Sequence, residues 1–291
     1  MAYKVDNAVI MAAGTASRFA PLSYERPKAL IEVKGEVLIE RQIRQLQEAG
    51  ISQIIVVVGY MKEHFRYLEE KFGVILVDND SYLTRNNNGS IYAAKDYIRN
   101  TYICSSDNYF NDNPFEQEVD EAYYAAVYAE GHTQEWCMQE DSRGFITDVK
   151  IGGENAWYML GHVFWSEPFS KAFLEILEKI YDQPETVDML WEKIFMAHLD
   201  TLKMKIRKYP ESFIFEFDTL DELRVFDTSY VDDTRSEILS AIAQKLGCRQ
   251  REIVEVHSYK DNTNAAAGIR FRVRAQHYEY SYTTKEITEV S

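Results

Sequence analysis

The sequence predicts an α/β protein in which helices cover both faces of a mixed, mainly parallel β-sheet. Short apolar, β-branched runs alternate with segments whose apolar residues recur at helical spacing, which is typical of strands joined by crossover helices. The expected elements of this first half are strands at 8–11, 53–58, 74–77 and 102–104 and helices at 38–49, 61–71 and 90–95. Ligands of such sheets bind beyond the carboxyl ends of the strands, so the loops after 8–11 and 102–104 are the candidate site.

The second half of the chain continues the pattern and then changes character. Its expected elements are strands at 123–128, 135–138, 145–149, 157–165, 203–207 and 213–218 and helices at 168–180, from 185, and at 221–226. From residue 232 we expect a helix capped by Thr234 and ended by Gly247. Strands at 252–257, 268–274 and 277–282 then form a three-stranded meander with a turn at 260–264. We therefore expect a main domain at 1–228 and a small α+β appendage at 229–291.

Composition limits the function. The 291 residues are 46% apolar, carry a formal net charge of −15 and include three widely spaced cysteines. The charge argues against nucleic acid or an anionic membrane as a partner. The cysteines are typical of reduced residues, and the first residues do not have the pattern of a signal peptide, so we expect a cytoplasmic protein. An acidic protein that binds a nucleotide must gather its cations locally.

The loop after the first strand has the residues of a polyphosphate cradle. Ala12, Ala13 and Gly14 have almost no side chain, so a ligand can lie against the backbone there. Arg18 and Lys28 follow and supply fixed positive charge. The spacing fits neither a P-loop nor the dinucleotide-binding glycine pattern. The alternative is a tight strand-to-helix turn that binds nothing.

Two acidic segments follow predicted strands and are candidates for a metal site. Asp107 comes directly after the strand at 102–104, and Glu216 and Asp218 lie two residues apart near 213–218, where a strand would present both on one face. Mg²⁺ in proteins is typically held by one or two carboxylates together with phosphates and water. An exposed strand end that happens to carry two acids is the alternative for Glu216 and Asp218.

The cradle motif A-A-G-x-x-S-R-x-x-P-x-S at 12–23, followed by R-P-K-A-L at 26–30, resembles the signature loop of nucleotidyltransferases that make sugar nucleotides and CDP-alcohols. Within that superfamily the chain is most similar to the bacterial CTP:phosphocholine cytidylyltransferases. The resemblance implies a Rossmann-like fold of the nucleotide-diphospho-sugar transferase type over residues 1 to about 228. One departure is Ala16, where the family usually has a second glycine.

The resemblance also assigns residues. It implies nucleotide contacts from Ala12, Ala13, Gly14, Thr15, Asn86, Asn87 and Ser90, catalytic roles for Lys28, Arg18 and Asp107, Mg²⁺ on Asp107 and Asp218, and a choline or acceptor site with Trp136 and Glu216. Two residues depart from the family: Ser105 replaces an acid, and Leu190 replaces a tyrosine. The alternatives are that Ser90 is only the N-cap of a helix after an Asn-rich turn, and that Trp136 is only core packing.

The implied reaction is transfer of CMP from CTP to phosphocholine. The same chemistry on phosphoethanolamine, an aminophosphonate or a sugar 1-phosphate remains open, as does a non-catalytic nucleotide-binding protein. Residues 229–291 faintly resemble the beginning of a choline-kinase-like lobe, but no kinase catalytic loop follows. A short open meander leaves strand edges that need covering, either by the main domain or by a partner, so a homodimer through this appendage is one expectation. The alternatives for this segment are a truncated fusion or an evolutionary relic.

Overall fold

The computed structural model describes residues 2–261 and 266–290, which form two compact units. Unit 1 contains the residues up to 14 and residues 38–216, and unit 2 contains residues 15–37 and those from 217 onward. Each unit is therefore built from two segments that are distant in sequence. Residue 228 is not the border between these compact units. As the border between a transferase domain and an appended one, it remains a prediction.

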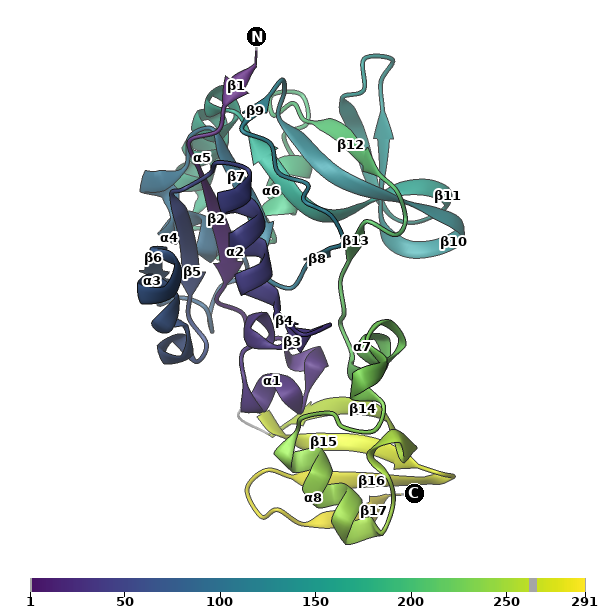
Figure 1. The fold of residues 1–291 in the computed structure, drawn as a ribbon. Coiled ribbons are helices and arrows are strands. Elements are labelled where there is room, and N and C mark those ends of the chain that lie inside the picture. Colours follow the sequence, from purple (N-terminus) through teal and green to yellow (C-terminus); the bar gives the residue numbers. More distant parts are fainter. Residues whose placement is uncertain (1, 262–265, 291) are drawn as a thin grey trace. The chain divides into compact units, whose positions relative to one another are not determined.

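Unit 1 is organised around a seven-stranded sheet in the order β12-β10-β11-β7-β2-β5-β6 (Figure 1). The strands are β2 (Asn7–Ala12), β5 (Ile54–Val58), β6 (Ile75–Asp78), β7 (Thr101–Ser105), β10 (Tyr123–Glu140), β11 (Ile146–Trp165) and β12 (Lys205–Tyr209). Only β11 runs antiparallel to its neighbours in this sheet. The predicted mixed, mainly parallel sheet is confirmed.

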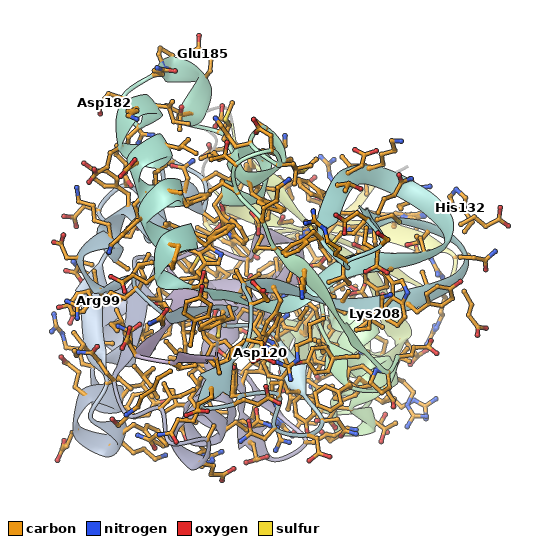
Figure 2. All side chains as sticks on the ribbon, turned by 90° about the horizontal axis from the view of Figure 1, so that it is seen from above. Arg99, Asp120, His132, Asp182, Glu185 and Lys208 are labelled. Atoms are coloured by element: carbon orange, nitrogen blue, oxygen red, sulfur yellow. The ribbon has the colours of Figure 1, made fainter. Side chains whose placement is uncertain are left out.

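Helices cover both faces of this sheet. Helix α2 (Leu38–Glu48) lies on one face and α5 (Glu167–Ile180) on the other (Figures 1 and 2). Phe173 and Leu177 of α5 are fully buried in the core with Trp165. The shorter helices are α3 (Tyr67–Phe72), α4 (Asn88–Ala93) and α6 (Trp191–Met196), with 3₁₀ turns η3 (Lys62–Phe65), η4 (Lys95–Tyr97) and η5 (Pro184–Thr186). Among the described residues, no helix is long and apolar enough to cross a membrane.

Two sequence expectations for unit 1 are wrong in their boundaries. The four strands predicted between 123 and 165 are two long strands, β10 and β11, whose pairing register shifts repeatedly. Such bulges let a strand bend and continue where the alternation of its side chains is interrupted. His132 lies on the outer part of this bent ribbon (Figure 2). The helix predicted at 61–71 is divided into η3 and α3, and Met61 before it has a left-handed backbone with φ of 50°.

Unit 2 combines the cradle loop with the C-terminal segment. Its elements are η1 (Ser17–Phe19), α1 (Leu22–Glu25), η2 (Lys28–Leu30), β3 (Glu32–Val33), β4 (Glu36–Val37), α7 (Leu220–Phe226), η6 (Thr228–Tyr230), α8 (Glu237–Leu246), η7 (Gln250–Glu252), β14 (Ile253–Lys260), β15 (Ala266–Val273), β16 (Gln276–Ser281) and β17 (Ile287–Val290). Helix α8 lies across one face of the meander (Figure 1).

The predicted appendage differs from the structure in two details. The meander has four strands, because Ile287–Val290 adds β17 beside β16. The N-cap of α8 is Ser236, whose hydroxyl accepts from the Leu239 amide at 3.0 Å, and not Thr234. Gly247 ends the helix in the left-handed conformation as expected. The turn expected at 260–264 lies mostly outside the described residues.

Candidate functional site

The predicted phosphate loop and Asp107 leave the sheet at the same edge of unit 1. Strands β2 and β7 are parallel neighbours, with Met11 paired to Ser105. Ala12, the last residue of β2, leads into Ala13 and Gly14, and Asp107 lies two residues beyond β7. A Cβ built on Gly14 would meet no atom within 4 Å, so the space in front of this residue is open. The edge therefore offers close backbone approach beside a carboxylate, as the sequence predicts.

A small two-stranded sheet brings the first acidic segment to Glu216. Strand β8 (Tyr109–Phe110) pairs with β13 (Ile214–Phe215), and Asn108 Nδ2 donates to Glu216 Oε2 at 3.1 Å. Residues about a hundred positions apart thus meet through backbone pairing. The expectation that Glu216 and Asp218 share one strand face is wrong, because β13 ends at Phe215.

The asparagine segment holds the beginning of α6. Helix α4 begins at Asn88, so Asn87 occupies the N-cap position and the alternative that Ser90 caps the helix is wrong. The Asn87 side chain accepts from the Trp191 amide at 2.7 Å and donates to Glu192 Oε2 at 3.0 Å. Asn86 Nδ2 donates to the Asp188 carbonyl at 3.2 Å. Ser90 is buried.

Glu192 is a site candidate that the sequence reasoning did not single out. Besides the bond from Asn87, its other oxygen accepts from the Tyr124 hydroxyl at 3.5 Å. Burial raises the pKa of the Glu192 carboxyl to about 7, although these hydrogen bonds act in the opposite direction and lower it. Glu216 is also an electrostatic neighbour of Tyr124. Hydrogen bonds therefore join Asn87 to Glu192 and Glu192 to Tyr124. The signal available in the sequence was an acid directly after Trp191, in the segment where Leu190 departs from the family.

Aromatic and acidic side chains gather where β10 and β11 pair. Trp136 is half-buried on β10 and packs against the hydrophobic core, and its neighbour Cys137 pairs with Tyr158 of β11. Burial raises the pKa of the Tyr158 hydroxyl, and the nearby carboxylates of Glu135, Glu211 and Glu216 raise it further. Tyr158 was predicted only as part of an apolar strand. One of these three acids, Glu216, was predicted for the acceptor site.

In unit 2, both predicted phosphate-binding cations lie beside the predicted metal ligand Asp218. Arg18 Nη1 is 2.6 Å from Asp218 Oδ2, and Lys28 Nζ is 3.8 Å from Oδ1. The Lys28 side chain is only 7% exposed, whereas that of Arg18 is 73% exposed. Buried Lys28 is thus a fixed charge, whereas the exposed Arg18 guanidinium is held by its ion pair with Asp218. The sequence did not predict this pairing.

The residue at the position of the family's second glycine has an unusual backbone conformation in this chain. Ala16, at the position of the family's second glycine, has a left-handed backbone with φ of 46° and ψ of 48°. Glycine adopts this conformation without steric cost, whereas an L side chain is strained there. Thr15, another predicted nucleotide residue, directly precedes it. Ala16 therefore adopts the left-handed conformation at a cost in backbone strain.

The segment that carries Arg18 and Lys28 is tied to the C-terminal segment within unit 2. The Lys34 amide donates to Asp227 Oδ2 at 2.7 Å, and the Tyr230 hydroxyl donates to the Glu32 carbonyl at 2.5 Å. The Tyr24 ring stacks on Tyr282 with centroids 3.9 Å apart. The loop is thus positioned by residues more than 190 positions later in the chain.

The donor chemistry fits a hard divalent ion. Across the residues that the structure describes, three or more His, Cys, Asp or Glu side chains nowhere form a metal-binding group. A site for Mg²⁺ needs only one or two protein carboxylates when phosphates and water complete the shell. Asp107 in unit 1 and Asp218 in unit 2 are oxygen donors of this kind.

Known proteins resemble this chain over most of its length. The MobA-like NTP transferase domain family matches residues 8–144. The choline-phosphate cytidylyltransferase of Streptococcus pneumoniae is 35% identical over 217 residues, which are 75% of this chain and 95% of that protein. The 2-aminoethylphosphonate cytidylyltransferase of Lancefieldella rimae is 37% identical over 234 residues, or 79% and 95% of the two chains.

Solved structures agree with this grouping. That of CTP:phosphocholine cytidylyltransferase from Streptococcus pneumoniae matches with a TM-score of 0.74 and 34% identity, covering 78% of this chain and 99% of the other. The inositol-1-phosphate CTP transferase of T. maritima shares the fold. Its structure matches with a TM-score of 0.59 and 15% identity, covering 76% of this chain and 93% of the other. The chain therefore belongs to the nucleotidyltransferase family of the bacterial choline-phosphate cytidylyltransferases.

Proposed function

We propose that this enzyme transfers CMP from CTP to a phosphorylated amine, with phosphocholine as the acceptor, and releases pyrophosphate. The observation that carries the proposal is the cluster of Lys28 and Arg18 on Asp218 in the signature loop. It occurs in a chain that spans 95% of two cytidylyltransferases. A protein that only sensed nucleotide would not need to keep this set of charged groups.

Nucleotide binding is assigned to two segments. Backbone amides at Ala12, Ala13, Gly14 and Thr15 would meet the phosphates, where small side chains allow close approach. Asn86, Asn87 and Ser90 are assigned to the base and ribose. Because the Asn87 side chain already bonds Trp191 and Glu192, we assign its influence on the nucleotide to its backbone and to the position of α4.

Enzymes of this family use a divalent metal ion, and we propose Mg²⁺ here, held by Asp107 and Asp218. When bound, the ion would neutralise phosphate charge and polarise the α-phosphorus. The residues of the chain do the remaining work. Arg18, with its planar fork, is suited to the β- and γ-phosphates, and buried Lys28 to the α-phosphate and the attacking phosphate.

The reaction needs positioning more than proton transfer. A phosphate monoester is already ionised near neutral pH, so its oxygen attacks without a general base. Both reactants are anions. Fixed cations that hold them in line lower the activation barrier in two ways: they reduce the entropy lost in reaching the transition state, and they stabilise its negative charge. Lys28 is held for this task by burial and by Asp218.

The acceptor's ammonium group is assigned to the aromatic and acidic cluster at β10 and β11. A quaternary ammonium donates no hydrogen bond, so it is recognised by aromatic faces and nearby carboxylates. Trp136 and Tyr158 supply rings, and Glu216 and Glu135 supply negative charge. This supports phosphocholine.

2-Aminoethylphosphonate is the second candidate acceptor. Leu190 stands where the family has a tyrosine, which removes one aromatic wall, and a primary ammonium gains more than a quaternary one from carboxylates such as Glu135. The relative from Lancefieldella rimae, which bears that name, is 37% identical. Phosphoethanolamine shares the same ammonium chemistry.

Three further expectations support a small-molecule enzyme of the cytoplasm. The net charge of −15 disfavours nucleic acid as a partner. Cys104, Cys137 and Cys248 are unpaired, as in a reducing compartment. Strands β14 and β17 are the two outer strands of the described meander, so a homodimer that pairs one of these edges remains a prediction.

Pyrophosphate release tests the proposed function directly. CTP, ATP, GTP and UTP would each be assayed with phosphocholine, 2-aminoethylphosphonate, phosphoethanolamine and glucose 1-phosphate. We expect release with CTP and the highest kcat/KM with phosphocholine. Preference for 2-aminoethylphosphonate would select the second candidate. Binding of CTP without turnover of any acceptor would contradict catalysis and support a sensor.

A further inference from the structure

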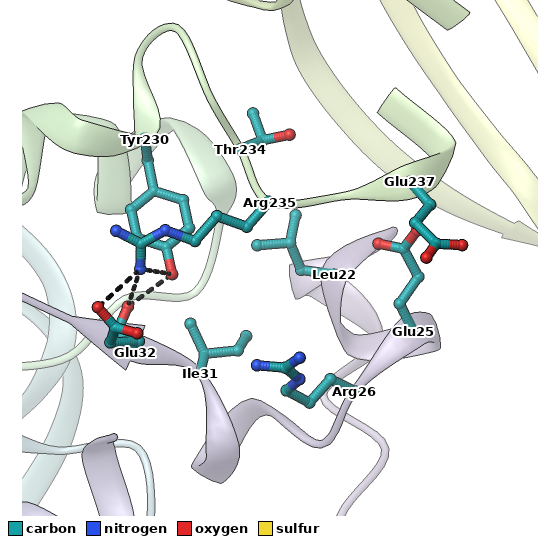
Figure 3. A pocket seen from close by; sticks show the side chains of 9 residues that line it. All are labelled: Leu22, Glu25, Arg26, Ile31, Glu32, Tyr230, Thr234, Arg235 and Glu237. Atoms are coloured by element: carbon teal, nitrogen blue, oxygen red, sulfur yellow. Dashed lines mark hydrogen bonds and ion pairs between the residues drawn. The ribbon is translucent and has the colours of Figure 1, made fainter. Parts of the chain in front are cut away.

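A cavity of about 320 Å³ lies within unit 2, and neither Arg18 nor Asp218 is among its lining residues (Figure 3). It is lined by Leu22, Glu25, Arg26, Ile31, Glu32, Tyr230, Thr234, Arg235 and Glu237. The first five of these residues come from the segment 15–37 of unit 2, and the last four come from its C-terminal segment. Its volume is at the lower end of the range of small-ligand sites.

One end of the cavity presents a cation. The Arg26 side chain is exposed and points into the cavity (Figure 3). Among the described residues, its guanidinium has no hydrogen bond, ion pair or ring contact. The second arginine is occupied: Arg235 bonds the Tyr230 hydroxyl at 3.1 Å and pairs with Glu32 Oε1 at 3.5 Å. Arg26 therefore offers its planar fork to an anion, such as a carboxylate or phosphate.

The other end presents two carboxylates. Glu25 and Glu237 lie next to each other (Figure 3), and burial, with a further contribution from the Glu237 carboxylate, raises the pKa of Glu25. Glu25 accepts only neutral donors, including the Ile238 amide at 2.8 Å. Neither carboxylate has a cationic partner among the residues that the structure describes. This end is complementary to an ammonium group.

The cavity walls favour a primary ammonium over a quaternary one. Tyr230, the only aromatic residue in the described lining, is covered by Arg235, whose guanidinium carbon is 4.4 Å from the ring centroid. No free aromatic face is left for a trimethylammonium, whereas carboxylates accept N–H donors. Leu22 and Ile31 in the lining provide apolar contact for methylene groups.

We propose that this cavity is a second binding site, which takes a small zwitterion with its anionic group on Arg26 and its primary ammonium on Glu25 and Glu237. Such a ligand bridges the segment that carries Lys28 to the C-terminal segment. The proposal does not require the chain to transfer CMP.

Calorimetric titration of the full chain without CTP tests this site. The probes are 4-aminobutyrate and 3-aminopropyl phosphate, which distinguish a carboxylate from a phosphate at Arg26, and the trimethylammonium analogue of 4-aminobutyrate. We expect at least one primary amine to bind, and the trimethylammonium analogue to bind about tenfold or more weakly. Glu237→Gln and Arg26→Gln should each weaken binding by about tenfold or more. Glu286→Gln, a carboxylate change in the same unit outside the cavity lining, should leave it unchanged.

Amide hydrogen exchange provides a second measurement. The Ile238 amide donates to Glu25, so the bound ligand should slow its exchange in the wild type and not in Glu237→Gln. The proposal is overturned if neither primary amine binds, if the analogue binds equally well, or if Glu237→Gln and Arg26→Gln bind like the wild type. Pyrophosphate release by Glu237→Gln would be measured separately, so loss of this site and loss of cytidylyl transfer are distinguished.

Discussion

Arg18 and Asp218, 200 residues apart in the sequence, form an ion pair with 2.6 Å between Nη1 and Oδ2. Asp218 also lies 3.8 Å from Lys28 Nζ, so both predicted phosphate ligands share this carboxylate. Under the proposed function, the phosphates of the substrate would offer Arg18 and Lys28 a second anionic partner, and Asp218 would be available to a metal ion.

Replacing Lys28 by methionine tests the buried cation. Methionine keeps the apolar stem and removes the charge, so we expect kcat/KM to fall by about 10²- to 10³-fold, as for loss of other preorganised charge stabilisers. Initial rates of pyrophosphate release give the value, and the thermal unfolding midpoint serves as the control. Lys62→Met, at an exposed lysine of unit 1, is a matched variant that should keep full activity. A Lys28→Met enzyme with normal kcat/KM would refute the assigned role.

Removal of divalent metal should abolish turnover. We expect no pyrophosphate release after treatment with EDTA and recovery on adding Mg²⁺, because carboxylates at Asp107 and Asp218 prefer a hard ion. Asp107→Asn should raise the Mg²⁺ concentration needed for half-maximal activity by tenfold or more. Asp112→Asn, an exposed neighbour, is the control. An Asp107→Asn enzyme with an unchanged Mg²⁺ requirement would remove this residue from the site.

The acceptor assignment predicts a selective effect at Trp136. Loss of one cation–π contact is worth about 0.5–2 kcal/mol, so Trp136→Leu should raise KM for phosphocholine by roughly 2- to 30-fold and leave KM for CTP unchanged. Steady-state kinetics with each substrate varied in turn separates the two. Ile151→Leu, at the residue paired with Trp136 in the sheet, controls for local packing. Equal changes in both KM values would indicate that Trp136 only packs.

The raised pKa of Glu192 should make the stability of the folded chain depend on pH. Its pKa is about 7 in the folded chain and near 4.5 in the unfolded one, so the folded state binds the extra proton between these values. The contribution of this group to stability is therefore lost as pH rises from about 4.5 to 7. Glu192→Gln removes the charge, keeps an oxygen that can accept from Asn87 Nδ2, and can donate its amide to the Tyr124 oxygen, so it should be more stable than wild type by about 2 kcal/mol at pH 8. Urea unfolding at pH 4 and pH 8 checks this, and an equal difference at both pH values would contradict it.

The C-terminal segment should be required for activity. Residues after 228 supply the Tyr230 bond to Glu32, the Ile238 bond to Glu25 and the Tyr282 stack on Tyr24. A chain that ends at residue 228 leaves the segment with Lys28 without these partners, so we expect at least a tenfold loss of kcat/KM and easier proteolysis of residues 15–37. Full activity of that chain would instead establish 1–228 as a self-sufficient domain.

The sequence by itself determined the α/β architecture, the signature loop and the two acidic segments. Alternation of buried runs with helical spacing is local, and small residues followed by fixed cations are visible without coordinates. The sequence did not predict the structural features that depend on pairing between distant segments. Strands β10 and β11 continue through bulges that interrupt the side-chain alternation, and β17 lacks the apolar pattern of a buried strand.

Only the tertiary structure decided which distant residues meet. Backbone pairing of β8 with β13 brings Asn108 to Glu216, and hydrogen bonds join the first turn of α6 to Asn87 and Glu192 to Tyr124. The division into two units separates Glu216 from Asp218, although they are two residues apart. The physical reason is that contact between distant segments is set by the packing and pairing of whole elements, whereas the sequence pattern reports only the local preference of each.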